Sequence, residues 1–322
     1  MKRCVCLLAA VAFTVGMMAS AGMAADKVTM AGIVFQEDQF FRIIELGMQD
    51  AAKKAGVEML LANSNNKPEK ELELVNTYVA RGVQAIVISP ISKTASAAAL
   101  KAAAAKGIKI IAYNSTVEGD FVSSFISSSG TELGKSSGEA AVKYIKEKLG
   151  GKANVAVLCF DSQVPEQSAE RVNGFIEALK AGGVETKLVS RQDAWLAEMA
   201  TKKVGDIITA NPDVNIIYAA NEGGTVGATM AVKAAGKAGK IAVFGIDASE
   251  QLCGFLLADD GILQAITGQK PFDIGSMSVN TALKVLKGEK AEALTIVPGL
   301  LLQRSAPEKV KEFVAWLKTV VK

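Results

Sequence analysis

The chain alternates short apolar runs with longer segments in which apolar residues recur every three or four positions. The run over 28–35 is of the first kind and predicts a buried strand. After it, Phe41, Ile44 and Met48 fall on one face of a helical projection, which predicts an amphipathic helix over 40–55. Gly56 comes directly after this segment, and glycine is the residue that most often ends a helix.

The same alternation continues almost to the end of the chain. Further strands are expected over 58–62, 84–89, 108–113, 122–126, 153–160, 186–190, 215–220, 240–247, 262–267 and 296–303. Further helices are expected over 68–81, 93–106, 131–149, 167–181, 195–210, 223–236, 249–259, 271–287 and 307–321. Apolar strands separated by helices are typical of parallel sheets that are covered on both faces. The strands are too many for one compact sheet, so the pattern predicts an α/β fold with two similar lobes.

Residues 1–25 are typical of a secretory signal peptide. Two basic residues, Lys2 and Arg3, precede an apolar stretch over 5–18, and small residues then continue to Ala25. The apolar stretch is too short to span a membrane comfortably, which argues against a retained anchor. We therefore expect a leader that is cleaved on export.

Charge and composition exclude several classes of function. The 322 residues include 36 basic and 33 acidic side chains, and a formal charge of +3 gives no electrostatic basis for binding nucleic acid. The chain has no histidine, which removes the usual general base, the Ser–His and Cys–His nucleophile pairs and most zinc sites. We expect neither a cofactor nor a metal. Beyond the leader, Cys159 and Cys253 are interpreted as buried apolar residues, with a disulfide between them left open.

Polar or aromatic side chains directly follow several of the predicted strands. In an open α/β sheet, ligands bind beyond the carboxyl ends of the strands. The residues in question are Asp38, Phe40, Phe41, Asn114, Ser115, Asn221 and Asp247. Each acid, amide or hydroxyl could simply cap the next helix. Their recurrence in both halves of the chain favours a shared cleft.

Two further residues are ambiguous from the sequence. Arg171 lies early in a predicted helix, where a surface pair with Glu170 or Asp161 is the ordinary interpretation. Trp195 lies at a predicted helix start, where it could pack in a core or offer a flat face to a ligand.

Taken together, these segments resemble the periplasmic monosaccharide-binding proteins of the ribose and galactose/glucose class, which are receptors of ABC sugar importers. The resemblance covers nearly all of the chain after the leader. It is carried by Asp38-Gln39-Phe40-Phe41, Asn63-Ser64-Asn65-Asn66-Lys67-Pro68, Arg81-Gly82-Val83-Gln84-Ala85-Ile86, Asn211-Pro212-Asp213-Val214, Ala220-Asn221-Glu222, Val243-Phe244-Gly245-Ile246-Asp247 and Lys284-Val285-Leu286-Lys287-Gly288-Glu289.

The resemblance implies two Rossmann-like lobes with parallel sheets, joined by a three-crossing hinge, as in type I periplasmic binding proteins. The first lobe would comprise residues 26–128 plus 270–298. The second would comprise residues 129–269 plus 299–322. A sugar would be held between the lobes, and the receptor would act without catalysis, as a monomer in the periplasm that delivers its ligand to a membrane permease.

The resemblance also assigns the ligand contacts. From the first lobe they would be Asp38, Phe40, Phe41, Asn114 and Ser115. From the second lobe they would be Arg171, Trp195, Asn221 and Asp247, with Gln269 at a crossing. Phe40 and Trp195 would enclose the faces of a sugar ring. The acids and amides would bind hydroxyl groups, and Arg171 would offer a planar donor fork.

Other functions stay open at this point. Asn114-Ser115 stands where ribose-binding members carry Asp-Arg, so a polyol or a furanosyl autoinducer is a possible ligand, with a chemoreceptor as a possible partner. An enzyme acting on sugars could use Asp38 and Asp247, because glycosidases work with two acids. A sugar-responsive repressor shares the fold, but the leader and the absence of a DNA-binding segment before residue 28 argue against it.

Overall fold

The computed structural model describes residues 27–320, so the predicted signal peptide lies outside the described residues. The strands are β1 Thr29–Val34, β2 Glu58–Asn63, β3 Ala85–Ile88, β4 Lys109–Tyr113, β5 Val122–Ser127, β6 Lys152–Cys159, β7 Glu185–Asp193, β8 Ile216–Ala219, β9 Ala242–Ile246, β10 Leu263–Gly268, β11 Leu294–Ile296 and β12 Leu300–Gln303. The helices are α1 Gln39–Ala55, α2 Pro68–Ala80, α3 Ala97–Ala105, α4 Gly130–Lys148, α5 Pro165–Ala181, α6 Ala197–Ala210, α7 Glu222–Ala234, α8 Glu250–Leu257, α9 Pro271–Leu286 and α10 Pro307–Val320.

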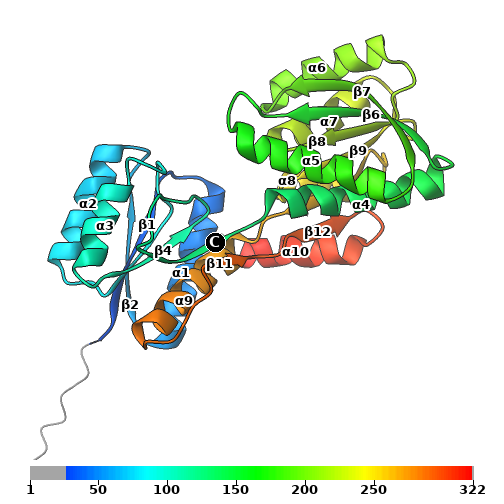
Figure 1. The fold of residues 1–322 in the computed structure, drawn as a ribbon. Coiled ribbons are helices and arrows are strands. Elements are labelled where there is room, and N and C mark those ends of the chain that lie inside the picture. The colour runs from blue at the N-terminus through cyan, green and yellow to red at the C-terminus, as the bar shows by residue number, and fades with distance from the viewer. Residues whose placement is uncertain (1–26, 321–322) are drawn as a thin grey trace, which may run out of the picture.

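The strands form two six-stranded sheets with equivalent strand orders. Their orders are β11-β5-β4-β3-β1-β2 and β12-β10-β9-β8-β6-β7. All neighbouring strands are parallel except β10 and β12, which pair antiparallel. Figure 1 shows the sheets in two separate bodies, with α10 beside the segments that connect them. "First lobe" and "second lobe" below refer to the division predicted from the sequence, whose boundaries stay a prediction.

Helices cover both faces of each sheet and bury a core on each side. In the first lobe, α1 and α9 pack on one face, and α2 and α3 on the other. In the second lobe, α4 and α5 cover one face, and α6, α7, α8 and α10 the other. Both faces of the strands are therefore apolar, which is why the strands are continuous hydrophobic runs in the sequence.

Three short segments pass from one sheet to the other. They are residues 128–129 between β5 and α4, residues 269–270 between β10 and α9, and residues 297–299 between β11 and β12. The prediction of one strand over 296–303 was wrong, because β11 and β12 belong to different sheets. Pro298 and Gly299 interrupt the apolar run, and both residues are unfavourable inside a strand.

The contact between α4 and α5 depends on two glycines. A Cβ on Gly134 would lie 2.0 Å from the carbonyl oxygen of Arg171, and a Cβ on Gly174 would lie 2.1 Å from that of Thr131. Only hydrogen atoms fit in these positions, so the two helix backbones touch directly. The contact fixes the helix turn that carries Arg171.

Two other features bear on the predictions. Cys159 and Cys253 are both buried and form no disulfide within residues 27–320, which confirms their interpretation as buried apolar residues. Within residues 27–320, no helix combines the length and hydropathy that a membrane span requires.

Candidate functional site

A cavity of about 530 Å³ lies between the lobes, at the carboxyl ends of the strands of both sheets. Of the ten residues predicted to contact a ligand, nine line it. They are Asp38, Phe40, Phe41, Asn114, Ser115, Arg171, Asn221, Asp247 and Gln269. The tenth, Trp195, does not line this cavity.

Asp38 is both a helix cap and part of the cavity wall. Its Oδ1 accepts a hydrogen bond of 2.9 Å from the backbone N–H of Phe41, and its Oδ2 accepts one from the side chain of Gln36. These donors hold the carboxylate at the positive N-terminus of α1. The capping and ligand-facing interpretations of Asp38 are therefore compatible.

The two phenylalanines of the first lobe have different environments. Phe41 is 3% exposed and belongs to the core beneath α1. Phe40 is only partly buried and packs against Phe41, with ring centroids 5.3 Å apart and planes at 90°. Because neighbouring helical residues point about 100° apart, Phe40 is the one that leaves the core side of the helix.

Asn114 follows β4 in an unusual backbone conformation. Its φ is 57°, in the left-handed region that few residues other than glycine, asparagine and aspartate adopt. Its backbone N–H donates to the carbonyl of Ile126 at 3.0 Å. Its side-chain amide lies within 3.4 Å of the Ser89 hydroxyl and 3.5 Å of the Ser115 hydroxyl.

Arg171 is buried on the second-lobe wall, with its side chain 9% exposed. Its Nη1 donates to the carbonyl of Ala220 at 2.9 Å and lies 3.8 Å from Oδ2 of Asp247. The guanidinium carbon lies 5.3 Å from the centre of the Phe160 ring. Its Nε has no hydrogen-bond partner among the described residues.

The surface pair considered for Arg171 is wrong, because α5 turns this side chain toward the sheet rather than toward solvent. Asp161 pairs instead with Arg191, at 2.7 Å between Oδ2 and Nη2.

Asn221 and Asp247 organise the neighbouring part of the wall. Asn221 caps α7 by accepting from the backbone N–H of Gly224 at 3.2 Å, and its amide donates to the carbonyl of Trp195 at 2.8 Å. Asp247 follows β9 with a φ of 74°. Its Oδ2 accepts from the backbone N–H of Glu222 at 2.9 Å. These bonds fix the orientation of both side chains on the cavity wall.

Trp195 is partly buried and packs against the second-lobe core on the α4 and α5 side. It follows the edge strand β7 and precedes α6, which begins at Ala197 rather than at residue 195. The structure does not bring its ring to the cavity opposite Phe40, so the proposed enclosure of a ring between the two stays a prediction.

Further residues line the cavity without having been assigned to the site. They include Phe160, Gln163, Gln167, Glu222 and Ser249. Glu222 could have been found, because it directly follows Asn221 at a strand end. Its carboxyl group is hydrogen-bonded to Ser249. Burial raises the pKa of Glu222 above its ordinary value, and the charge of Asp247 adds to the effect, while the Ser249 hydrogen bond opposes it.

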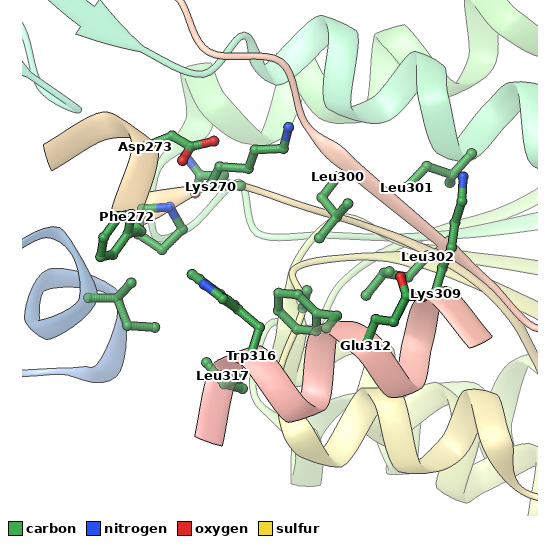
Figure 2. A pocket seen from close by; sticks show the side chains of 15 residues that line it. Lys270, Phe272, Asp273, Leu300, Leu301, Leu302, Lys309, Glu312, Trp316 and Leu317 are labelled. Carbon is green, nitrogen blue, oxygen red and sulfur yellow. The ribbon is translucent and has the colours of Figure 1, made fainter. Parts of the chain in front are cut away.

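A second cavity, of about 610 Å³, lies beside the crossing at Gln269 and Lys270 (Figure 2). Trp316 of α10 points toward Phe272 of α9, with ring centroids 6.1 Å apart. Leucines of β12 and Phe313 form much of the remaining wall. Gln269, Lys270, Asp273, Lys309 and Glu312 also line this cavity, but most of its wall is apolar, so the first cavity is the better candidate for a polar ligand.

Within the described residues, no three His, Cys, Asp or Glu side chains are grouped so that they could hold a metal ion.

Comparison with known proteins identifies the family. A model of the periplasmic binding protein domain matches residues 32–290. The chain belongs to the periplasmic binding protein family. This result and the two sheets confirm the family resemblance and the α/β fold predicted from the sequence.

Two curated relatives of this periplasmic binding protein come from Escherichia coli K12. The ABC transporter periplasmic-binding protein YphF is 30% identical over 306 residues, which cover 92% of this chain and 91% of YphF. The ribose import binding protein RbsB is 32% identical over 295 residues, covering 91% and 95% of the two chains. Among solved structures, a periplasmic ribose ABC transporter protein from Conexibacter woesei matches with a TM-score of 0.78 and 23% identity, over 92% of this chain and 98% of its own.

Proposed function

We propose that this periplasmic binding protein captures a monosaccharide between its lobes and delivers it to the permease of an ABC importer. The observation that carries the proposal is the composition of the 530 Å³ cavity, to which both lobes contribute. Carboxylates and amides can pair with hydroxyl groups, a guanidinium offers several donors, and the Phe40 ring can cover an apolar ring face. The ribose binding named for RbsB supports the same ligand class.

Capture works by closure of the two lobes. A ligand that contacts both walls at once binds the closed state more tightly than the open one and shifts the population toward it. The crossings at 128–129, 269–270 and 297–299 are short, so they are suitable places for the backbone rotation. Gln269 lies on one of them and also lines the cavity.

The polar groups of the cavity are arranged for binding rather than for turnover. Asp38 caps a helix, and Asp247 accepts from a backbone N–H and lies beside Arg171. Both carboxylates can accept further hydrogen bonds from hydroxyl groups in their ionised form. We therefore propose a receptor without catalytic activity, exported by cleavage near Ala25 and acting as a monomer. A chemoreceptor partner stays a prediction from the sequence.

Mass spectrometry of ligand released from the purified protein on denaturation tests this function directly. We expect a monosaccharide, and titration calorimetry with the same compound should then give saturable binding with no chemical change to the sugar. If a polyol or a furanosyl diol is released instead, that compound and not a monosaccharide is the ligand of this receptor. Conversion of the added sugar to a product would contradict the receptor function.

A further inference from the structure

The cavity between the lobes has an excess of negative charge. Three carboxylates line it, those of Asp38, Glu222 and Asp247, against one guanidinium, that of Arg171. The remaining lining side chains are neutral amides, hydroxyls, aromatic rings and aliphatic groups. When the lobes close around a ligand, this net negative charge is enclosed together with it.

The three carboxylates are not equally compensated. Asp247 lies 3.8 Å from Nη1 of Arg171 and accepts a backbone hydrogen bond. Asp38 accepts two hydrogen bonds at the N-terminus of α1. Glu222 has only the Ser249 hydroxyl as a side-chain partner, and no cation within the described part of the chain forms an ion pair with it. Glu222 is therefore the carboxylate whose charge is least balanced.

Glu222 is exposed to solvent, and the groups around its carboxylate desolvate it only in part. Its pKa is raised mainly by desolvation, and the nearby carboxylate of Asp247 raises it further. Closure of the lobes removes more water, so an unbalanced carboxylate becomes more costly unless the ligand supplies a donor or a positive charge.

Arg171 provides an independent indication of what the ligand carries. Its side chain is 9% exposed and lines the same cavity, yet no group in the part of the chain that the structure describes forms a hydrogen bond with its Nε. A buried donor of this kind needs an acceptor, such as a hydroxyl or ring oxygen. The ligand should therefore carry a hydrogen-bond acceptor near Arg171 and a positively charged donor near Glu222.

We propose that the ligand is an aminated monosaccharide or polyol whose protonated amino group binds the carboxylate of Glu222. The inference rests on the proposed function and narrows its substrate class. A protonated amine neutralises part of the excess charge and donates strong, charge-assisted hydrogen bonds. The competing way to balance the site is protonation of Glu222 itself, which would favour a neutral sugar.

Matched sugar pairs distinguish these two cases. Titration calorimetry at pH 7 would compare D-glucosamine with D-glucose and N-acetyl-D-glucosamine, and D-galactosamine with D-galactose and N-acetyl-D-galactosamine. We expect at least one amine to bind about tenfold more tightly than its parent sugar, which is the effect of one good ion pair of about 1.4 kcal/mol. The N-acetyl form should lose this gain, because it carries no positive charge.

The proposal is overturned if, in every pair that binds, the neutral sugar binds as tightly as its amine or more tightly. Absence of binding by every member of the panel would instead contradict the monosaccharide receptor function, and the inference with it. These two failures are distinguishable, because only the first leaves a sugar bound.

A variant pair assigns the preference to one carboxylate. Glu222→Gln keeps the size of the side chain and an oxygen that can accept from Ser249, but removes the charge. We expect it to bring the affinity ratio of amine to parent sugar close to one. The control Glu198→Gln changes an exposed glutamate in the first turn of α6 and should leave the ratio unchanged. Glu222→Gln should unfold cooperatively and no earlier than the native protein. An unchanged ratio in this variant would overturn the assignment.

Discussion

Asn114 and Asp247 occupy equivalent positions in the two lobes. Each directly follows the third strand of its sheet order, β4 in one and β9 in the other, and each has a left-handed backbone, with φ of 57° and 74°. Both line the cavity. Strained backbone of this kind is retained where the surrounding structure requires it, often at ligand sites. Each lobe therefore places one polar side chain on its own wall of the cavity, and both do so by the same local backbone geometry.

Substitution at Asn114 should separate backbone from side-chain effects. Asn114→Gly relieves the left-handed conformation, so its free energy of unfolding should stay within about 0.5 kcal/mol of the native value. Asn114→Ala should lose about 1 kcal/mol, because alanine disfavours this region. Urea denaturation measures both. Ligand affinity should fall in both variants, and full affinity in Asn114→Gly would show that the amide does not contact the ligand.

Removal of the guanidinium at Arg171 should abolish or greatly weaken sugar binding. Hydrogen bonds to charged groups contribute about 1.5–3 kcal/mol, so we expect Arg171→Ala to lose affinity by about 10- to 150-fold for each bond to the ligand, as measured by titration calorimetry. Circular dichroism should show an intact fold. Arg81→Ala, at an exposed position of the first lobe, serves as the control and should bind like the native protein. Unchanged affinity in Arg171→Ala would place the ligand elsewhere.

A methyl group at Gly134 should push α4 away from α5. Its Cβ would lie 2.0 Å from the carbonyl oxygen of Arg171, and overpacking of this type costs about 1–3 kcal/mol. Gly134→Ala should therefore unfold at lower urea concentration and also bind ligand less tightly. The control Gly205→Ala lies in α6, where a Cβ meets no atom within 4 Å, and should gain about 0.5–1 kcal/mol. Equal stability of the two variants would contradict the close helix contact.

The pH dependence of stability should report the environment of Glu222. Its folded-state pKa lies above the ordinary value near 4.5, so the folded state binds a proton more tightly than the unfolded state. Stability from this group is therefore greatest at low pH and is lost as pH rises through the folded-state pKa. Glu222→Gln should be more stable than the native protein at pH 7.5, and this advantage should shrink below pH 4.5. Thermal unfolding over this range tests the sign, and a variant that is less stable than the native protein at pH 7.5 would contradict it.

The contact between Phe272 and Trp316 should couple the two lobes. Trp316 belongs to α10, which packs on the second-lobe core, whereas Phe272 belongs to α9, which packs on the first. A double-mutant cycle with Phe272→Ala and Trp316→Ala should give a coupling of about 0.5–1.5 kcal/mol, the usual range for an aromatic pair. Additive losses in chemical denaturation would show that the rings act independently.

The elements of the fold could be predicted because their signals are local. The face formed by Phe41, Ile44 and Met48 identifies α1 without any knowledge of its neighbours, and all three residues are buried. The position of the cavity could also be predicted, because all parallel strands of a sheet present their carboxyl ends at one edge and polar residues follow several of these ends.

The remaining features depend on contacts between distant parts of the chain. Arg171 donates to Ala220, which is 49 positions away, and no local pattern shows that α5 turns this side chain inward. The orientation of Trp195 depends on how the edge strand β7 meets the second-lobe core. The run over 296–303 has a uniform apolar pattern although it serves two sheets, and only Pro298 and Gly299 mark the change.

The three passages between the sheets have a consequence for biogenesis. The edge strand β11 of the first sheet and the helix α9, which covers one face of that sheet, both follow β6 to β10 in the chain. They are therefore synthesised only after all the residues of β6 to β10. Until then, Met30, Ile44 and Met48 have no α9 to cover them. Vectorial synthesis therefore cannot complete the N-terminal half first. Completion of the first sheet and its core has to wait for residues 271–296, so the two lobes finish folding in close succession although their sequences begin far apart.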